Sequence, residues 1–210
     1  MQLNKAELEA LERKYRLNLI NSISGVKPAN LIGTKSAAGQ ENLAIFSSVV
    51  HLGSNPAELG FVLRPQSEPP RDTYANILSS GYYTINHISA SFIQKAHYTS
   101  AKLERGESEF ERMKLESEYL SDFFAPFVKA SAVKLGMKHQ ESILLPNGCT
   151  FVMGSVELLH AAEASINDLG QLDLADYQGV GIGGLNTYYG LQKLDSFPYV
   201  REDEIPDFQA

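Results

Sequence analysis

Residues 42–63, with the sequence NLAIFSSVVHLGSNPAELGFVL, decide the fold class of this chain. Residues 43–52 are rich in β-forming side chains and are long enough to cross a sheet, and residues 59–63 form a second candidate strand. Between them lies Gly-Ser-Asn-Pro at 53–56, where the Asn-Pro step favours a turn and ends the strand. This stretch therefore predicts two strands joined by a turn.

The sequence on both sides of this stretch has the same pattern of strand-forming runs separated by turn residues. Asn147-Gly148, flanked by apolar runs, predicts a hairpin. A helix is expected at 73–80, with Asp72 as its N-cap and Gly81 at its end. The further strand candidates are residues 31–35, 82–88, 132–138, 143–145 and 150–162. Many strands with few helices between them predict a mainly β fold with peripheral helices, in which an antiparallel sheet closes into a barrel.

The two ends of the chain and one internal segment do not have this pattern of strands and turns. Residues 4–17 have the apolar spacing of a short amphipathic helix, and residues 89–127 are charged and predict helical or irregular structure over the sheet or a site. Residues 195–210 form a C-terminal tail, and its acidic part, residues 201–210, is expected to be an arm or disordered. No linker or repeat divides the sequence, so we expect one domain over 1–210 with its core at about 17–194.

Composition excludes several classes of protein. The formal net charge of -7 argues against a nucleic-acid binder, because such proteins neutralise phosphates with Lys and Arg. No apolar run approaches the roughly 20 residues that span a bilayer, so no membrane association is expected. The N-terminus lacks the apolar centre of a secretory signal, and we expect a cytoplasmic protein. The single cysteine, Cys149, allows no internal disulfide and fits a structural thiol.

The sequence motifs for zinc binding, serine hydrolysis and dinucleotide binding are absent from this chain or incomplete in it. It has no paired His/Cys spacing and no H-E-x-x-H, so no metal site is expected. No G-x-S-x-G elbow is present. Residues 179–184 read G-x-G-x-G-G, but the Leu-Asn-Thr-Tyr-Tyr-Gly that follows does not begin a helix, which argues against a dinucleotide fingerprint.

Five segments, taken in order, resemble the flavin reductase and flavoredoxin-like family of FMN-binding split β-barrels. They cover 42–48 with 53–57, 71–77 with 81–86, 125–135, 154–160 with 168–173, and 183–190. Ala57 stands where a second proline is common in that family. The resemblance implies an antiparallel, Greek-key-like split barrel that binds FMN. It also implies a homodimer with the flavin site at or near the interface of the two subunits.

The resemblance also suggests which residues hold the cofactor. The strand expected beneath the flavin ring contributes Asn42, Ala44, Ile45, Phe46, Ser47 and Ser48. The loop and helix start expected at the phosphate contribute Arg64, Ser67, Arg71 and Thr73. Tyr188 or Tyr189 would close over the flavin edge. From the residues alone, the same groups also fit a core strand, a solvated loop whose arginines pair with Glu68 and Asp72, and aromatic anchors.

The implied activity is that of an NAD(P)H:flavin oxidoreductase, which passes hydride from NADH or NADPH to FMN and then electrons to an acceptor such as an oxygenase. A histidine near the nicotinamide could bond or protonate the reduced flavin, and the candidates are His51, His97 and His160, each of which also fits a structural role. Three alternatives stay open. These are a flavoprotein that reduces a metal ion, quinone or nitro compound, an FMN-binding electron carrier or storage protein, and a related barrel that binds haem or no cofactor.

Overall fold

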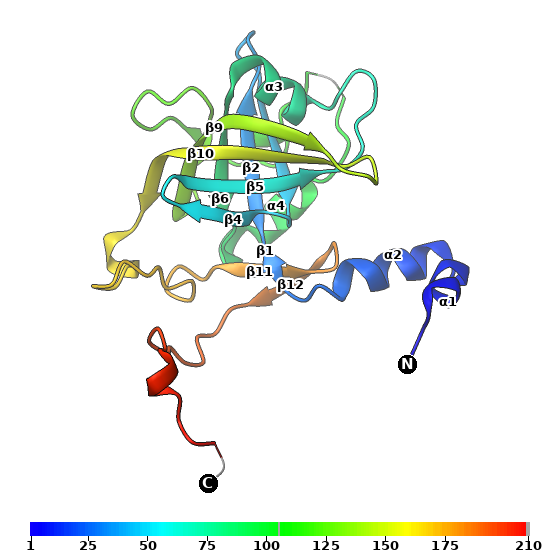
Figure 1. Ribbon diagram of the computed structural model, residues 1–210. Helices are drawn as coiled ribbons and strands as arrows, with labels where there is room; N and C mark the ends of the chain where they lie inside the picture. Colours follow the sequence, from blue (N-terminus) through cyan, green and yellow to red (C-terminus); the bar gives the residue numbers. More distant parts are fainter. Residues whose placement is uncertain (105, 209–210) are drawn as a thin grey trace.

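Strand-forming runs assemble into a seven-stranded sheet, the central feature of the computed structural model, which describes residues 1–104 and 106–208 (Figure 1). Every neighbouring pair in it is antiparallel, in the order β3-β2-β6-β9-β10-β5-β4. The strands are β2 (Asn30–Lys35), β3 (Glu41–Phe46), β4 (Val50–Ser54), β5 (Ala57–Leu63), β6 (Tyr82–His87), β9 (Val133–Leu144) and β10 (Thr150–Ala161). The mainly β, antiparallel fold expected from the sequence is confirmed.

Side chains alternate between the two faces of the sheet and build two apolar clusters. In β2, Ile32 packs into one cluster with Phe61 and Tyr83, whereas its neighbour Leu31 packs into the other with Leu43. All five of these side chains are fully buried. The first cluster fills the interior of the curled sheet, and we call it the barrel core. The second, the outer core, lies beneath the helical segment that follows β6.

Contacts between β3 and β5 close the curled sheet. The rings of Phe46 and Phe61 meet edge to face with centroids 5.1 Å apart. Ser48 donates its hydroxyl to the carbonyl of Val62 at 3.2 Å and accepts from the Val62 N–H at 3.0 Å. The single strand expected at 43–52 is therefore wrong: the chain leaves β3 after Phe46, is held against β5 by Ser48, and resumes as β4 at Val50. The turn at 53–56 is confirmed, because β4 and β5 form a hairpin around Asn55-Pro56.

The β9–β10 hairpin is longer than the sequence suggested. The separate strands expected at 132–138 and 143–145 are one continuous strand, and the polar residues between them lie on its solvent-facing part. Two register shifts opposite β10 let the hairpin bend. The turn at Asn147-Gly148 is confirmed, and Gly148 takes the positive φ of 78° that a glycine tolerates.

A second, three-stranded sheet lies below the barrel in Figure 1. Its strands are β1 (Lys27–Pro28), β11 (Val180–Gly183) and β12 (Thr187–Gly190), in the order β1-β11-β12. The glycine-rich residues 179–184 thus form a strand that turns into another strand. The next element after them is β12 and not a helix, in agreement with the rejection of a dinucleotide fingerprint.

Helices and short strands lie around the sheet. The helix expected at 73–80 is confirmed as α3 and ends at Gly81 in the left-handed conformation (φ 76°). Asp72 is its first helical residue instead of its cap, and Arg71 takes the N-cap position. Residues 89–127 are helical and irregular, as expected, and pack on the outer core through Phe92, Ala96 and Phe110. The elements are α3 (Asp72–Ser80), η1 (Ala90–Phe92), α4 (Ile93–Tyr98), α5 (Glu109–Arg112), β7 (Ser117–Glu118), β8 (Phe127–Val128) and η2 (Glu163–Ser165).

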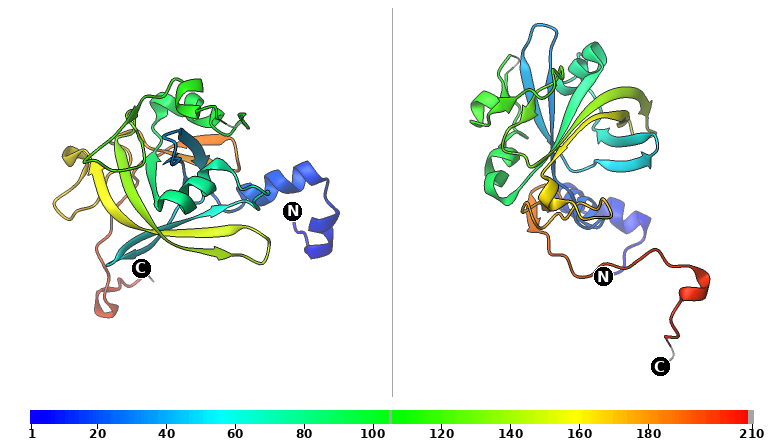
Figure 2. Two further views of the ribbon diagram at one scale, coloured as in Figure 1. Left: turned by 90° about the horizontal axis from the view of Figure 1, so that it is seen from above. Right: turned by 90° about the vertical axis from the view of Figure 1, so that its left-hand side faces the viewer.

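Both chain ends project from the body of the molecule on the side of the three-stranded sheet (Figures 1 and 2). The single helix expected at 4–17 is wrong. The chain forms α1 (Lys5–Ala10) and α2 (Arg13–Ser22), because Leu11 turns to extended backbone and the Glu12 carboxylate caps the second helix. After β12 the chain runs extended to a single turn, η3 (Glu202–Glu204). Among the described residues, no helix has the length and apolar character needed to cross a membrane.

His87, at the end of β6, predicts how stability depends on pH. Burial lowers its pKa from 6.5 to about 4 in the folded protein. Between pH 4 and pH 6.5, His87 is therefore protonated more in the unfolded chain than in the folded one. The contribution of neutral His87 to the free energy of unfolding is complete above pH 6.5 and is lost as the pH falls toward 4. For His87→Leu we expect the loss of unfolding free energy over this window to be smaller than in the wild type by on the order of 2 kcal/mol. Urea unfolding at several pH values measures it, and the exposed His160→Leu, the matched control, should keep the wild-type slope.

Candidate flavin site

One side of β3 forms an edge of the seven-stranded sheet. β3 is an edge strand of the seven-stranded sheet, and the N–H of Leu43 points away from β2 to the carboxylate of Glu109, 3.0 Å away. Successive amides of a strand point to opposite sides, so within β3 the N–H group of Ile45 faces the same side as that of Leu43. Within β3, the N–H groups of Leu43 and Ile45 thus point to this outer edge, and Glu109 accepts from that of Leu43.

A buried polar cluster joins β3 to the start of α3. Asn42 donates its side-chain N–H to Thr73 Oγ1 at 3.0 Å and to Thr34 Oγ1 at 3.3 Å. Asn76, one helical turn further on, donates to the same Thr34 oxygen at 3.1 Å. All four side chains are buried. The fold therefore places two of the expected site residues, Asn42 and Thr73, in direct contact, although 31 positions separate them in the chain.

The first turn of α3 leaves its backbone N–H groups without a side-chain cap. Arg71 occupies the N-cap position and makes no capping hydrogen bond, so the N–H groups of the first turn are open to an anion. Arg64 and Arg71 are exposed, and neither forms a salt bridge within the described part of the chain. In the part of the chain that the structure describes, no ion pair joins either arginine to Glu68, one of the two partners expected for a solvated loop. Ser67, in the same loop, donates its hydroxyl to the carbonyl of Pro69 at 3.0 Å.

Glu109 is a residue of this region that sequence reasoning missed. Its side chain is buried against β3, and burial raises the pKa of its carboxyl, with a smaller contribution from the negative charge of Asp72. The N–H of Leu43 works in the opposite direction by stabilising the carboxylate. This contact fixes α5 to the edge of β3. No local pattern indicates it, because the two residues are 66 positions apart.

His97 and Tyr188 meet on the outer face of β3. The Nδ1 atom of His97 lies 3.1 Å from the Tyr188 hydroxyl, and the rings are nearly perpendicular. Tyr188 and Ile45 both pack against the outer core. Burial raises the pKa of Tyr188 to about 12, so the phenol stays protonated at neutral pH. Tyr189 is 48% exposed on the next position of β12.

The other two candidate histidines lie elsewhere on the sheet. His51 is exposed on β4, and His160 is exposed near the end of β10, paired in register with Lys134. Among the described residues, neither forms a side-chain hydrogen bond or salt bridge with β3 or with α3. Within residues 1–104 and 106–208, no three His, Cys, Asp or Glu side chains are grouped so that they could hold a metal ion.

Comparisons with known proteins give the family. A model of the family described as "Flavin reductase like domain" matches residues 26–179. A crystal structure from Shewanella frigidimarina, provisionally described as a flavin reductase with a split barrel domain, is 45% identical. Its TM-score is 0.91, over 95% of this chain and 100% of the other. Nitrilotriacetate monooxygenase component B from Bacillus cereus shares the fold, with a TM-score of 0.82 at 19% identity over 94% of this chain and 98% of that one.

Curated relatives are more distant. The protein YwrF of Bacillus subtilis, which is uncharacterized, is 24% identical over 162 residues, or 75% of this chain and 79% of its own length. Because the family match covers most of the chain, and the Shewanella protein is similar over nearly all of it, this chain belongs to the flavin reductase-like family of split-barrel, flavin-related oxidoreductases.

Proposed function

We propose that this chain binds FMN across the open edge of β3 and the start of α3, and that it passes hydride from NADH or NADPH to the bound flavin. The observation that carries this proposal is the direct contact of Asn42 with Thr73. It joins a strand edge that offers backbone donors to an uncapped helix start beside two exposed arginines. These are the two kinds of surface that a flavin ring and its phosphate require.

The residues of the phosphate side suit a dianion. Backbone N–H groups at a helix N-terminus carry partial positive charge, and α3 has nine residues, enough for a developed dipole. Arg64 and Arg71 can close over the phosphate with charge-assisted hydrogen bonds. Thr73 uses its oxygen to accept from Asn42, which leaves the hydroxyl proton free to donate to a phosphate oxygen.

The residues of the ring side act by orientation and by donating hydrogen bonds. FMN supplies the hydride and electron chemistry, and the protein supplies binding, orientation and stabilisation of charge. The N–H groups of Ile45 and Ser47 would donate to the polar edge of the ring, which stabilises the negative charge of the reduced form. Tyr188, held by His97, would form a wall at the ring's side. We also propose that a second copy completes the pocket in a homodimer, as the family resemblance implies.

Substitutions at Thr73 test the phosphate contact. Thr73→Val removes the hydroxyl but keeps the shape, and we expect it to weaken FMN binding about 10-fold or more, the value of one hydrogen bond to a charged group. Thr73→Ser keeps the hydroxyl and should bind within about 3-fold of the wild type. Fluorescence titration with FMN measures both. Equal affinities for the valine and serine variants would contradict a phosphate bond from Thr73.

Turnover tests the proposed reaction. The purified protein should oxidise NADH or NADPH when FMN is present, at a rate proportional to protein concentration and well above that of free FMN. Both nucleotides are assayed, since nothing in the site discriminates between them. Tight FMN binding without turnover of either nucleotide would indicate the electron-carrier or flavin-storage alternative and would contradict the reductase assignment.

A further inference from the structure

Helix α2 presents apolar side chains that nothing in the described part of the chain buries. None of its residues is buried, and Tyr15, Leu17 and Ile20 are 49%, 43% and 45% exposed. The helix has ten residues, and an isolated helix of fewer than about 12–15 residues is marginal in water unless an apolar face packs against a partner. The helix therefore lacks the packing that its length requires.

Positive charge lies beside these apolar side chains on one side of α2. An open groove of about 360 Å³, which we call the α2 groove, is lined by Arg13, Arg16, Leu17, Ile20 and Asn21. These residues follow one another at helical spacing, so they share one face of the helix. Just beyond α2, Lys27 of β1 donates to the carbonyl of Asn21 at 2.7 Å and ties the end of the helix to the three-stranded sheet. The α2 groove therefore fits a segment that combines apolar side chains with negative charge.

The described residues of the C-terminal tail, 195–208, have this composition. Phe197 and Tyr199 are 78% and 91% exposed. Shortly after them, the single turn η3 consists of three acidic residues in succession. In Figures 1 and 2, the tail and α2 leave the body of the molecule in different directions. The tail therefore does not lie on the α2 groove of its own chain.

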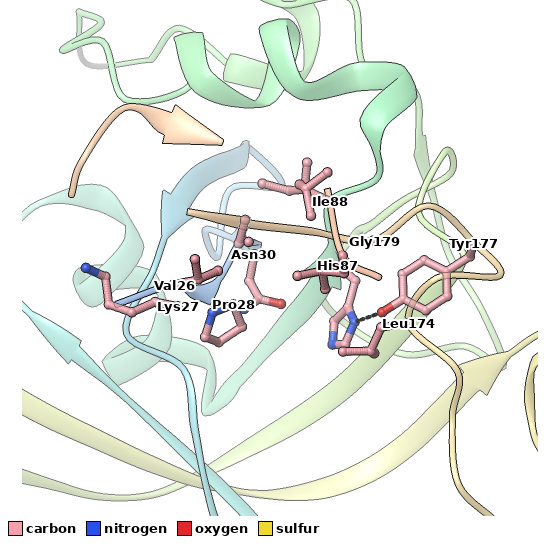
Figure 3. A pocket seen from close by; sticks show the side chains of 13 residues that line it. Val26, Lys27, Pro28, Asn30, His87, Ile88, Leu174, Tyr177 and Gly179 are labelled. Atoms are coloured by element: carbon pink, nitrogen blue, oxygen red, sulfur yellow. Dashed lines mark hydrogen bonds between the residues drawn. The ribbon is translucent and has the colours of Figure 1, made fainter. Parts of the chain in front are cut away.

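Uncovered apolar surface also joins the two segments where they leave the body. Val26, which follows α2, and Leu191, which precedes the tail, both line a mostly apolar cavity of about 240 Å³ beside the three-stranded sheet (Figure 3). A partner bound to both ends of the chain would thus cover one continuous region.

The chain exposes enough surface for a stable interface. Its accessible surface is 13566 Å², whereas a compact monomer of 23.1 kDa exposes about 9,700 Å². The difference of roughly 3,900 Å² is several times the area of about 800 Å² that each partner buries in a stable complex. The two projecting ends contribute to this difference, because a segment that leaves the body is exposed on most sides. The chain therefore has the free area that a dimer of two copies requires.

We propose that the tail of one copy binds the α2 groove of a second copy. The two aromatic side chains of the tail pack on Leu17 and Ile20, which buries apolar surface. The acidic turn η3 lies beside Arg13 and Arg16, which fixes the direction of the tail. A two-fold axis makes the contact reciprocal, so each copy provides its tail and receives that of the other. None of the residues proposed to hold FMN lies in the groove or in the tail, so the contact can be tested apart from flavin binding.

Cross-linking of the full chain tests this contact. The variant Cys149→Ser/Asn21→Cys/Ser196→Cys places one thiol in the α2 groove and one in the tail, and it keeps the apolar side chains of both. A bifunctional maleimide should link residue 21 of one copy to residue 196 of the other. The product is a covalent dimer, and mass spectrometry of its peptides identifies the linked positions.

Charge reversal shows whether the contact depends on the proposed groups. In the same background, Arg13→Glu/Arg16→Glu should lower the yield of covalent dimer at least about 10-fold, because like charges then face each other. Glu202→Lys/Asp203→Lys should lower it in the same way. The two changes together place opposite charges against each other again and should restore the yield, which a folding defect would not do.

The matched control, Lys5→Glu/Lys14→Glu, makes the same change of charge outside the α2 groove and should leave the yield unchanged. A link that forms only within one chain would show that the tail folds onto its own helix, and would overturn the proposal. A chain that sediments with phosphatidylserine vesicles and forms no link between copies would overturn it too, in favour of a lipid surface. A dimer in analytical ultracentrifugation without the link from 21 to 196 would overturn this contact and leave the homodimer proposed at the flavin site intact.

Discussion

The double variant Arg64→Ala/Arg71→Ala will bind FMN at least about 100-fold more weakly than the wild-type chain. Each arginine is exposed beside the uncapped start of α3 and has no salt-bridge partner among the described residues. A charge-assisted hydrogen bond to a phosphate contributes about 1.5–3 kcal/mol, so losing two contacts costs about 3 kcal/mol or more, which is a factor of about 100. The fold should survive, because neither side chain is part of a core.

Two comparisons make this prediction specific to the phosphate. Riboflavin lacks the phosphate, so its affinity should be the same for the double variant and the wild type within about 3-fold. The control variant Arg13→Ala/Lys14→Ala also removes two positive charges, but from an exposed part of α2, and it should leave FMN affinity unchanged. An equal loss for riboflavin, or an equal loss in the α2 variant, would show that the arginines do not bind the phosphate.

Gly33→Ala will destabilise the fold by about 3 kcal/mol or more. A Cβ on Gly33 would lie 2.4 Å from the carbonyl oxygen of Pro126 and 2.6 Å from Thr84 Oγ1. Those two atoms are hydrogen-bonded to each other at 2.7 Å inside the fold, and one of them belongs to the backbone. Neither can swing aside as a flexible side chain could, so β2 or the segment at Pro126 must shift.

Urea unfolding measures this loss as a lower midpoint. Gly190→Ala, at the end of β12, is the matched control, since its Cβ would meet no atom within 4 Å. It should unfold within about 0.5 kcal/mol of the wild type. A Gly33 variant as stable as the control would mean that β2 and the segment at Pro126 do not pack as closely as described.

The fold was largely predictable because its signals are local. Strand propensity and the turns at Asn55-Pro56 and Asn147-Gly148 identify most of the sheet. The prediction of a single strand at 43–52 was wrong for a physical reason. The apolar pattern is continuous from 43 to 52, and only the hydrogen bonds of Ser48 to Val62 in β5 separate β3 from β4. A hydrogen bond to a residue far away in the chain cannot be recognised from a short stretch of sequence.

The candidate site was predictable only in part, and for the same reason. Asn42 and Thr73 follow from the family resemblance, and the fold joins them. Glu109 was missed because its partner is the backbone of a strand far away in the sequence.

The visible spectrum of the purified protein, titrated with FMN and then mixed with NADH or NADPH in the absence of oxygen, tests whether this chain is a flavin reductase. We expect saturable FMN binding with a perturbed flavin spectrum, followed by bleaching of the flavin band on adding at least one of the two nucleotides. A protein that leaves the FMN spectrum unchanged and binds no FMN would contradict the assignment of the β3 edge and the α3 start as a flavin site.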